Sequence, residues 1–534
     1  MEYSKLFLGL PELTNEIIKY FRNDFSTLHS CMLVNRLWCR LTIPLLWEDP
    51  FSIPTENYHF IYVYLNNLNQ HDKLLLKEYG IKSNSFLTNN NSTLFNYPYY
   101  IKYLNTWKII ESIEKWVKEV KIIKYQNDIN LIRLIYKSLF KVFIENEVIL
   151  NTFEIEMDTN MDYDYFNVAF ELILNHPGFI NNIKILKLYF GDLTRFDNLL
   201  SLLSNCNTVS SIYLKCQNII IEKFLSKIII SQNNLQKISF FYNNLPLYHT
   251  LLSLKNSNCS NTLTNILFYH VDFKNIFIFN QVFENLNNLK SIHIIYCLSL
   301  NSNFIDQIIG INKPFKLTSL FLDDTFQNNL CQIDTFKLFF QKCADYLENF
   351  GFNFNSLNDE LRRELLEQVL NYCTKIKFFE SSENNHYRLF LSFDIIENIF
   401  HYLNYLTISS KNINNCSIIL HELGQILPLK LDYLNLVLTF DENDFEIFLK
   451  NSQNIFIKKL LISNNYYGNV KRNILPFIEK YIMKKKRVKY LAFKDMDDLF
   501  YMKDKVEEFK SFDIEIQDYD ILITYCYEYI EETY

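Results

Sequence analysis

The sequence predicts an α/β solenoid of about 14 strand–turn–helix repeats, bent into a horseshoe and preceded by a small all-helical module. The first observation is an apolar pattern, L-x-x-L-x-L, which recurs at intervals of roughly 26 to 33 residues. The second is that apolar residues at helical spacing follow each pattern. The third is that the chain has 534 residues, 49% of them hydrophobic, with only 8 Gly and 10 Pro. A chain of this length exceeds what one compact core usually holds, so an extended array is favoured.

The first element along the chain is a compact helical unit at residues 8–48. Pro11 suits the first turn of a helix, because its φ is already close to the helical value. Apolar residues then recur with helical spacing through residues 13–21, and a second helix is expected with Ser26 as its N-cap. About fifty residues with so much apolar surface are marginally stable alone, so we expect this unit to bind a partner.

Three motifs in this unit are Leu10-Pro11-x-Leu13, Leu33-Val34-x-Arg36-x-Trp38 and the closing Leu45-Leu46-Trp47. On these motifs the unit resembles an F-box, the family whose members dock on the Skp-type adaptor of cullin–RING ubiquitin ligases. The resemblance implies that the adaptor contacts are Leu10, Pro11, Ile17, Leu28, Val34 and Trp38. A simpler alternative is that the unit only caps the first repeat, which solenoids need for solubility.

Residues 49–116 have the most irregular composition and are predicted as a linker and N-terminal cap. A polar, Asn-rich loop at residues 84–98 interrupts them, with a helical stretch at residues 72–79 before it and an aromatic stretch that ends at Trp107 and Trp116 after it.

The repeats are predicted over residues 117–516. The fourth and sixth positions of each pattern alternate as in a strand and point to one face, and the first position lies on the incoming bend of the chain. Parallel strands lie ~4.8 Å apart whereas packed helices need ~8–10 Å, which predicts the bend of a horseshoe with the strands on its concave side. The patterns begin at Val117, Leu150, Ile183, Val209, Leu235, Leu263, Leu289, Leu317, Leu347, Cys373, Leu403, Leu431, Ile457 and Val488.

The repeat length is similar to that of leucine-rich repeats and shorter than tetratricopeptide, ankyrin or HEAT periods. The pattern loosely resembles the cysteine-containing subtype, in which Cys or Asn often follows the strand, as Cys297 does here. Other cysteines precede a pattern, at Cys206, Cys259 and Cys343. Because no spacing fits a zinc site, we interpret these thiols as buried packing groups and expect no metal.

The third, fifth and seventh positions of each pattern are predicted to face the concave side, where a protein substrate would bind. These positions are rich in aromatic residues, and exposed aromatics often mark a binding surface. The alternative is that they only reflect a chain in which 16% of residues are aromatic. The candidate substrate residues are Tyr189, Tyr213, Phe241, Tyr269, Phe321, Phe379, Tyr405, Tyr433 and Tyr490. Residues 517–534, which are acidic and rich in tyrosine, are predicted as a C-terminal cap.

Composition and motifs exclude several classes of function. The formal net charge of −7 argues against a nucleic-acid-binding surface, and apolar runs are too short to cross a membrane. The eleven cysteines show no disulfide framework and the N-terminus shows no signal peptide, so an intracellular protein is expected, cytoplasmic or nuclear. Neither a zinc-protease helix nor a phosphate loop is present, so we expect neither an enzyme nor a cofactor.

Two functions remain open from the sequence. The first is a substrate receptor of an SCF-type cullin–RING ubiquitin ligase, in which the helical unit binds the Skp-type adaptor and the concave face binds an unknown protein substrate. The second is a leucine-rich-repeat scaffold for protein interactions that has no link to ubiquitylation.

Overall fold

The structure is a computed structural model of the whole chain. It describes residues 11–22, 24–53, 58–79, 81, 93–120, 128–191, 199–203, 206–216, 219–242, 247–323, 333–353, 359–382, 386–464, 474–494 and 499–534.

Parallel strands form a sheet in which they follow one another in chain order, from β1 to β15. Each strand therefore pairs with the strands of the neighbouring repeats, as in a solenoid. The strands are β1 (Tyr103–Asn105), β2 (Thr152–Met157), β3 (Ile185–Phe190), β4 (Ser211–Cys216), β5 (Lys237–Phe241), β6 (Asn265–Tyr269), β7 (Ser291–Ile295), β8 (Leu317–Asp323), β9 (Asn349–Asn353), β10 (Phe378–Ser382), β11 (Tyr405–Ser409), β12 (Lys430–Leu438), β13 (Phe456–Asn464), β14 (Val488–Lys494) and β15 (Glu515–Ile516).

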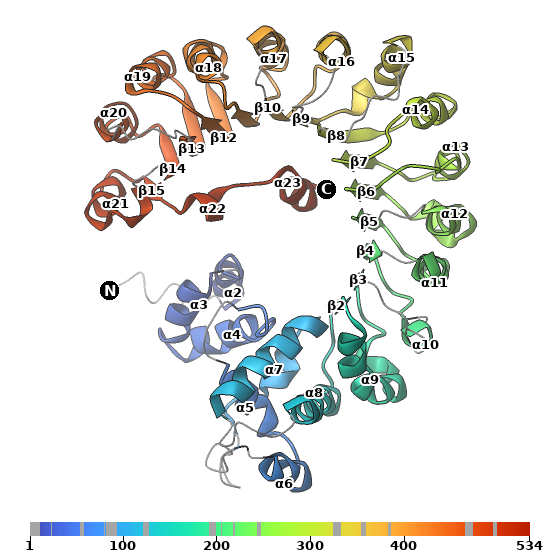
Figure 1. Cartoon of the computed structure of the whole chain (residues 1–534). Coiled ribbons are helices and arrows are strands. Elements are labelled where there is room, and N and C mark those ends of the chain that lie inside the picture. The colour runs from blue at the N-terminus through green and yellow to red at the C-terminus, as the bar shows by residue number, and fades with distance from the viewer. Residues whose placement is uncertain are drawn as a thin grey trace. The chain divides into compact units, whose positions relative to one another are not determined.

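Helices connect successive strands and pack on one face of the sheet, which confirms the predicted α/β class of strand–helix repeats (Figure 1). The helices before the repeats are α2 (Pro11–Lys19), α3 (Phe25–Met32), α4 (Arg36–Leu46), α5 (Phe60–Leu65) and α6 (Gln70–Glu78). Those of the repeats are α7 (Thr106–Val120), α8 (Asp128–Glu145), α9 (Asn160–Asn175), α10 (Leu199–Leu203), α11 (Ile219–Ile230), α12 (Tyr248–Asn256), α13 (Phe279–Phe283), α14 (Ser302–Ile309), α15 (Ile333–Cys343), α16 (Asp359–Tyr372), α17 (His386–Asn398), α18 (Ile413–Ile426), α19 (Glu442–Asn451), α20 (Leu475–Ile478) and α21 (Lys503–Lys510).

The chain divides into two compact units, which we describe separately. The first contains Met1–Ile238 and Leu252–Leu263, and the second contains Ser239–Leu251 and Thr264–Tyr534. In each unit we call the face of the sheet opposite the connecting helices the inner face.

The repeat around β11 shows how the sequence forms a strand followed by a helix. Leu406 and Ile408 alternate along the strand and are 0% and 2% exposed, so both point into the core between the sheet and the helices. Asn412 then caps α18, and its side chain accepts bonds from two backbone N–H groups at the start of the helix. Gly424 lets α18 approach α19 closely, because an added Cβ there would lie 2.8 Å from the Cβ of Asn451.

Two predicted patterns are wrong. The pattern at Val117 lies in α7, where Ile109, Ile113, Trp116 and Val120 recur at helical spacing and are buried. The strand of that repeat is instead β1, whose three residues are too short to show any periodicity.

The pattern at Cys373 is also displaced. The register of β10 aligns Phe379 with Phe350 and Leu406, which are core residues, so the repeat begins at Ile376 and has Ser381 at its sixth position. Ser381 is only 1% exposed and lies within 3.3 Å of the hydroxyl of Ser392. Because a serine occupies this core position, the apolar pattern did not reveal the true register. The predicted pattern was placed three residues too early, so it assigned core residues of β10 to the inner face and inner-face residues to the core.

The segment of residues 517–534, which we call the tail, does not continue the stack. After β15, its two short helices α22 (Tyr519–Leu522) and α23 (Cys526–Thr533) run back along the inner face of the second unit, opposite the connecting helices (Figure 1). The segment predicted as a cap therefore covers the sheet face that was predicted to bind substrate.

Candidate functional site

The N-terminal helices α2 to α4 form a small module with its own core. Ile18, Leu28 and Leu45 are buried together, and Trp38 packs partly against them. Asp24, rather than the expected Ser26, caps α3 by accepting a bond of 3.0 Å from the backbone N–H of Thr27. This arrangement orders the three helices around one cluster of apolar side chains.

The predicted adaptor residues fall into different environments. Leu28 is 0% exposed and belongs to the internal core, so its prediction as an adaptor contact is wrong. Ile17 and Trp38 are half-buried, Pro11 is exposed, and Val34 is 58% exposed. Leu10 lies outside the described residues. The sequence could not show whether the apolar residues of α3 face the core or a partner, because the same side chains suit either environment.

Among the described residues of the module, the large exposed apolar side chains lie on α2, in the turn after it and at the turn between α3 and α4. Leu33 is 71% exposed and Val34 58%, while Tyr20 is 90% and Leu13 49% exposed. Leu33 and Val34 directly precede Asn35, whose side chain accepts the N–H groups of Leu37 and Trp38 and so caps the start of α4. Sequence reasoning missed Leu33 and Tyr20 as candidate contacts.

The inner face of the first unit carries a polar and aromatic row. Tyr213 lies between two lysines, with the Nζ atoms of Lys187 and Lys237 at 5.6 Å and 6.0 Å from the centre of its ring. Lys187 also pairs with Glu154, at 3.6 Å. The predicted residues Tyr189 and Tyr213 both lie on this face and are half-buried. A row of charged side chains and aromatic rings can contact a polar surface of a partner protein.

The inner face of the second unit is covered by the tail. The ring of Tyr527 lies 5.4 Å from that of Phe241 and 4.9 Å from that of Tyr269, and the ring of Tyr529 lies 4.5 Å from that of Tyr405. Hence these three predicted substrate residues face the tail rather than open solvent.

The other predicted substrate residues of the second unit are also buried or partly covered. Phe321 is 0% exposed and packs in the cluster under α23. Tyr433 is 0% exposed, and its hydroxyl accepts a bond of 3.1 Å from the backbone N–H of Thr524. Tyr490 is half-buried beside α22, whereas Phe379 is not on the inner face at all and lies in the core. The prediction that Phe379 faces the substrate is therefore wrong, because Phe378 occupies that place.

A carboxyl group lies beneath the tail. The hydroxyl of Tyr296 donates to the carboxylate of Glu380 at 3.2 Å, and the thiol of Cys526 in α23 donates to the same hydroxyl at 3.5 Å. Burial raises the pKa of the Glu380 carboxyl to about 7, against a smaller opposing effect of the bond from Tyr296. Gly351 lies between Phe321 and Glu380, and an added Cβ would be 2.5 Å from the Phe321 ring, so only glycine leaves space for that ring. Glu380 and Tyr296 were not found from the sequence, since nothing local marks them.

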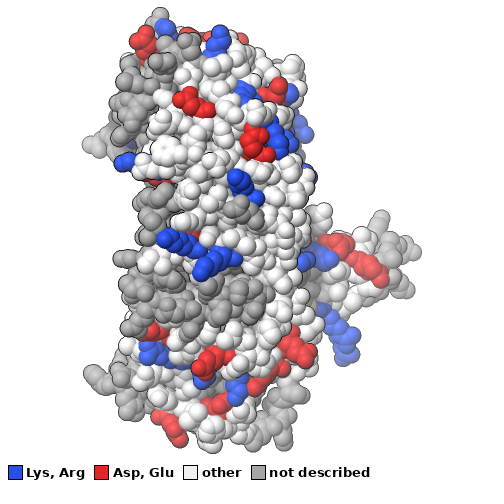
Figure 2. Space-filling model, turned by 90° about the vertical axis from the view of Figure 1, so that its right-hand side faces the viewer, with Lys and Arg blue, Asp and Glu red and all other residues white. Residues whose placement is uncertain are grey.

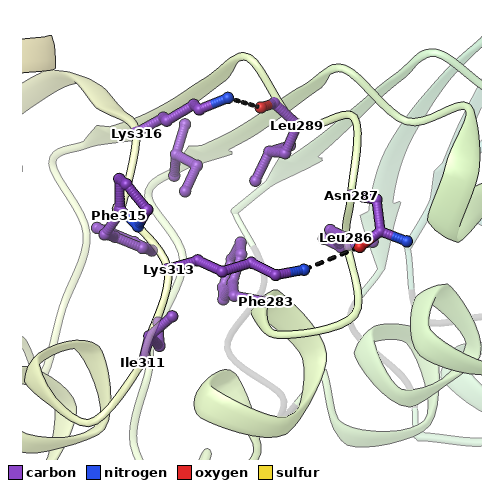
Figure 3. A pocket seen from close by; sticks show the side chains of 10 residues that line it. Phe283, Leu286, Asn287, Leu289, Ile311, Lys313, Phe315 and Lys316 are labelled. Atoms are coloured by element: carbon purple, nitrogen blue, oxygen red, sulfur yellow. Dashed lines mark hydrogen bonds between the residues drawn. The ribbon is translucent and has the colours of Figure 1, made fainter.

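The structure also contains a cavity of about 130 Å³ between neighbouring repeats of the second unit (Figure 3). Its lysines are already bonded, because Lys316 Nζ donates to the carbonyl of Leu289 and Lys313 Nζ to the side chain of Asn287, both at 2.8 Å. Most of the other lining side chains are apolar, such as Phe283 and Phe315. The cavity brings together no acid, base and nucleophile, so it suits a packing gap rather than a catalytic site.

The described residues form no group that could bind a metal ion, and the face drawn in Figure 2 carries charges of both signs. In the face drawn in Figure 2, the described acidic and basic side chains are interspersed. Among the described residues, no three His, Cys, Asp or Glu side chains are grouped closely enough to bind a metal ion. No helix in the described part of the chain has both the length and the apolar character needed to cross a membrane. Burial raises the pKa of the Cys206 and Cys297 thiols to about 12, as expected for inert packing groups.

Comparison with known proteins adds little. No protein-family model and no curated protein matches this chain. Among solved structures, the chain is similar to the crystal structure of the Rad7 and Elc1 complex in yeast, with 13% sequence identity and a TM-score of 0.34. That similarity covers 70% of this chain and 87% of the other chain. A similarity of this size does not bear on function.

Proposed function

We propose that this protein is the substrate-recognition subunit of an SCF-type cullin–RING ubiquitin ligase and that it performs no chemistry itself. Its N-terminal module would bind a Skp-type adaptor, and its repeats would hold a protein substrate near the ubiquitylating subunits. The gain in rate would come from proximity alone.

The observation that carries this proposal is the exposed apolar pair Leu33 and Val34 on a module whose core is already complete. A helical cap would turn its apolar residues toward the repeats it covers, whereas these side chains are 71% and 58% exposed. Leu33 and Val34 also belong to the motif through which the segment resembles an F-box. Burying the exposed parts of both side chains against a partner would contribute on the order of 2–4 kcal/mol, since burying a whole aliphatic side chain contributes about 1.5–3 kcal/mol.

The test is binding of the intact chain to a purified adaptor–cullin complex, measured by co-elution and by titration. We expect Leu33→Asp combined with Val34→Asp to weaken this binding by at least roughly a hundredfold, because two charges would have to be desolvated at the interface.

A matched control is Leu429→Asp, which places the same charge at a side chain of the second unit that is 68% exposed. It should leave adaptor binding unchanged. If the unaltered chain does not bind the adaptor complex, the result would favour the alternative of a repeat scaffold without ligase partners. Binding that survives the double substitution would contradict the role given to Leu33 and Val34.

A further inference from the structure

The tail contacts the inner face of the second unit through one side of α23. Cys526, Tyr529 and Ile530 are 3%, 9% and 0% exposed, and their i, i+3, i+4 spacing places them on one face of the helix. The sheet residues that they cover are apolar and come from four strands: Leu267, Ile295, Phe321 and Phe378.

Polar side chains of the same face bind the end of the tail. The hydroxyl of Tyr534 donates to a carboxylate oxygen of Glu348 at 2.5 Å and accepts a bond of 3.3 Å from the amide of Asn349. The amide of Asn265 donates to the carbonyl oxygen of Tyr534 at 3.0 Å. Nearer the start of the tail, the hydroxyl of Tyr519 donates to Asn435 at 2.8 Å. The sheet thus recognises both apolar and polar groups of the segment.

The tail nevertheless lies on the sheet and does not extend it. Gln517 donates a backbone bond to Leu491 at 3.0 Å, and beyond it each hydrogen bond from the described tail to the repeats involves a side chain, including the pair of Lys494 Nζ and the Asp520 carboxylate at 2.8 Å. Its outward side remains in solvent, with Ile521 78% and Tyr525 58% exposed. Helices of four and eight residues are not stable alone, so α22 and α23 depend on this contact for their structure. The tail can therefore leave without breaking the pairing of the strands.

The sheet face beneath the tail is too apolar to remain exposed to solvent. If the tail left, Leu267, Ile295, Phe321 and Phe378 would be uncovered together on β6, β7, β8 and β10, and soluble proteins rarely expose a large apolar patch of this kind. A competing occupant must therefore offer similar chemistry.

We propose that the tail is an internal ligand of the inner face, and that a partner protein displaces it by presenting an amphipathic helix of the same chemistry. That helix would carry a small or aliphatic residue, an aromatic residue and an aliphatic residue at i, i+3 and i+4, and a hydroxyl or amide four residues beyond the last of them to meet Glu348 and Asn349. The tail, being tethered, is present at high effective concentration, so only a partner with additional contacts would displace it fully. This inference does not depend on adaptor binding.

Cys526 allows the opening of the tail to be measured in the intact chain. Its thiol is buried where α23 packs on the sheet, so it becomes accessible if the tail alone opens. Cys297 and Cys416, which are 2% and 0% exposed, lie within the core of the repeats. We would expose the protein to a thiol reagent under native conditions and follow each cysteine by mass spectrometry of the digested chain. We expect Cys526 to react at least roughly tenfold faster than Cys297 and Cys416, because only the tail must open.

A peptide copy of residues 517–534, carrying Cys526→Ser, then tests whether the bared face binds a segment in trans. We expect the peptide to raise the reaction rate of Cys526 in proportion to its concentration, because it captures the open state. The same peptide carrying Tyr529→Ala and Ile530→Ala should have no effect.

Two substitutions of the same kind in the intact chain provide matched controls. Ile530→Ala, on the docked side, should accelerate the reaction of Cys526, and Ile521→Ala, on the exposed side, should not. Neither should change the reaction of Cys297. Equal rates for Cys526, Cys297 and Cys416 would overturn the proposal, because the tail would then open only when the whole unit unfolds. A fast reaction of Cys526 that the peptide does not alter would overturn it too, since the face would not bind such a helix. Neither readout involves the adaptor, so the two proposals can fail separately.

Discussion

Replacing Glu380 by glutamine should make the stability of this protein less sensitive to pH. The carboxyl of Glu380 is linked to Cys526 of the tail through the hydroxyl of Tyr296, and burial raises its pKa from 4.5 to about 7 on folding. The folded state therefore binds the proton more tightly than the unfolded state, and the free energy of unfolding falls as the pH rises through this range. Glutamine stays neutral and keeps an oxygen that can accept the bond from Tyr296.

The size of the effect follows from the two pKa values. One unit corresponds to about 1.36 kcal/mol, so the full penalty is about 3 kcal/mol, of which about 2.5 kcal/mol develops between pH 5 and pH 8. This is an upper bound, because Glu380 is half-buried and water screens part of the charge.

The assay is urea unfolding of the original chain and of Glu380→Gln at several pH values, with Glu397→Gln on the exposed side of α17 as the control. The advantage of Glu380→Gln over the original chain should grow as the pH rises from about 5 to 8, and this growth should exceed any seen for Glu397→Gln at its exposed position. An advantage that is constant with pH, or that shrinks as the pH rises, would refute the assignment of a protonated carboxyl beneath the tail.

Two further predictions concern the core of the repeats. Phe379→Ala should lower the free energy of unfolding by about 3–5 kcal/mol in a urea titration, because its ring is 0% exposed, whereas Phe390→Ala, at a ring 50% exposed, should cost under about 1 kcal/mol. Equal costs for the two would contradict the register of β10. Gly424→Ala should cost about 1–3 kcal/mol, since its Cβ would lie 2.8 Å from the Cβ of Asn451, whereas Gly178→Ala, with no atom within 4 Å, should be close to neutral. A thermal unfolding scan that ranks the two glycine variants in the opposite order would rule out the close approach of α18 and α19.

Most of the repeat fold could be predicted because each repeat contains its own signal. Alternation along a strand and helical spacing along a helix depend only on nearby residues, so the patterns at Leu150 and at Leu403 coincide with β2 and β11. The pattern is misleading where a strand is very short or where a polar residue occupies a core position. β1 has three residues, and in β10 the buried Ser381 took the place of an apolar residue.

The candidate sites were less predictable, because exposure depends on what the rest of the chain covers. Leu28 and Val34 both fit an apolar interface in the sequence, yet one is 0% and the other 58% exposed. The sequence correctly placed the aromatic residues from β3 to β8 on the inner face, but it did not show that the tail covers those of the second unit. Tyr527 contacts Phe241 across nearly three hundred residues of sequence, and no local pattern records such a contact.

The sequence by itself determined the α/β class, the strand–helix repeat and which residues of most strands point to each face, because these follow from periodicities of two and 3.6 residues. Only the tertiary structure decided which of the inner-face residues remain open to a partner. The tail buries those of the second unit by packing one side of a short helix on strands far away in the sequence. The tail binds there because Cys526, Tyr529 and Ile530 pack against a surface that forms only when strands distant in the sequence have assembled.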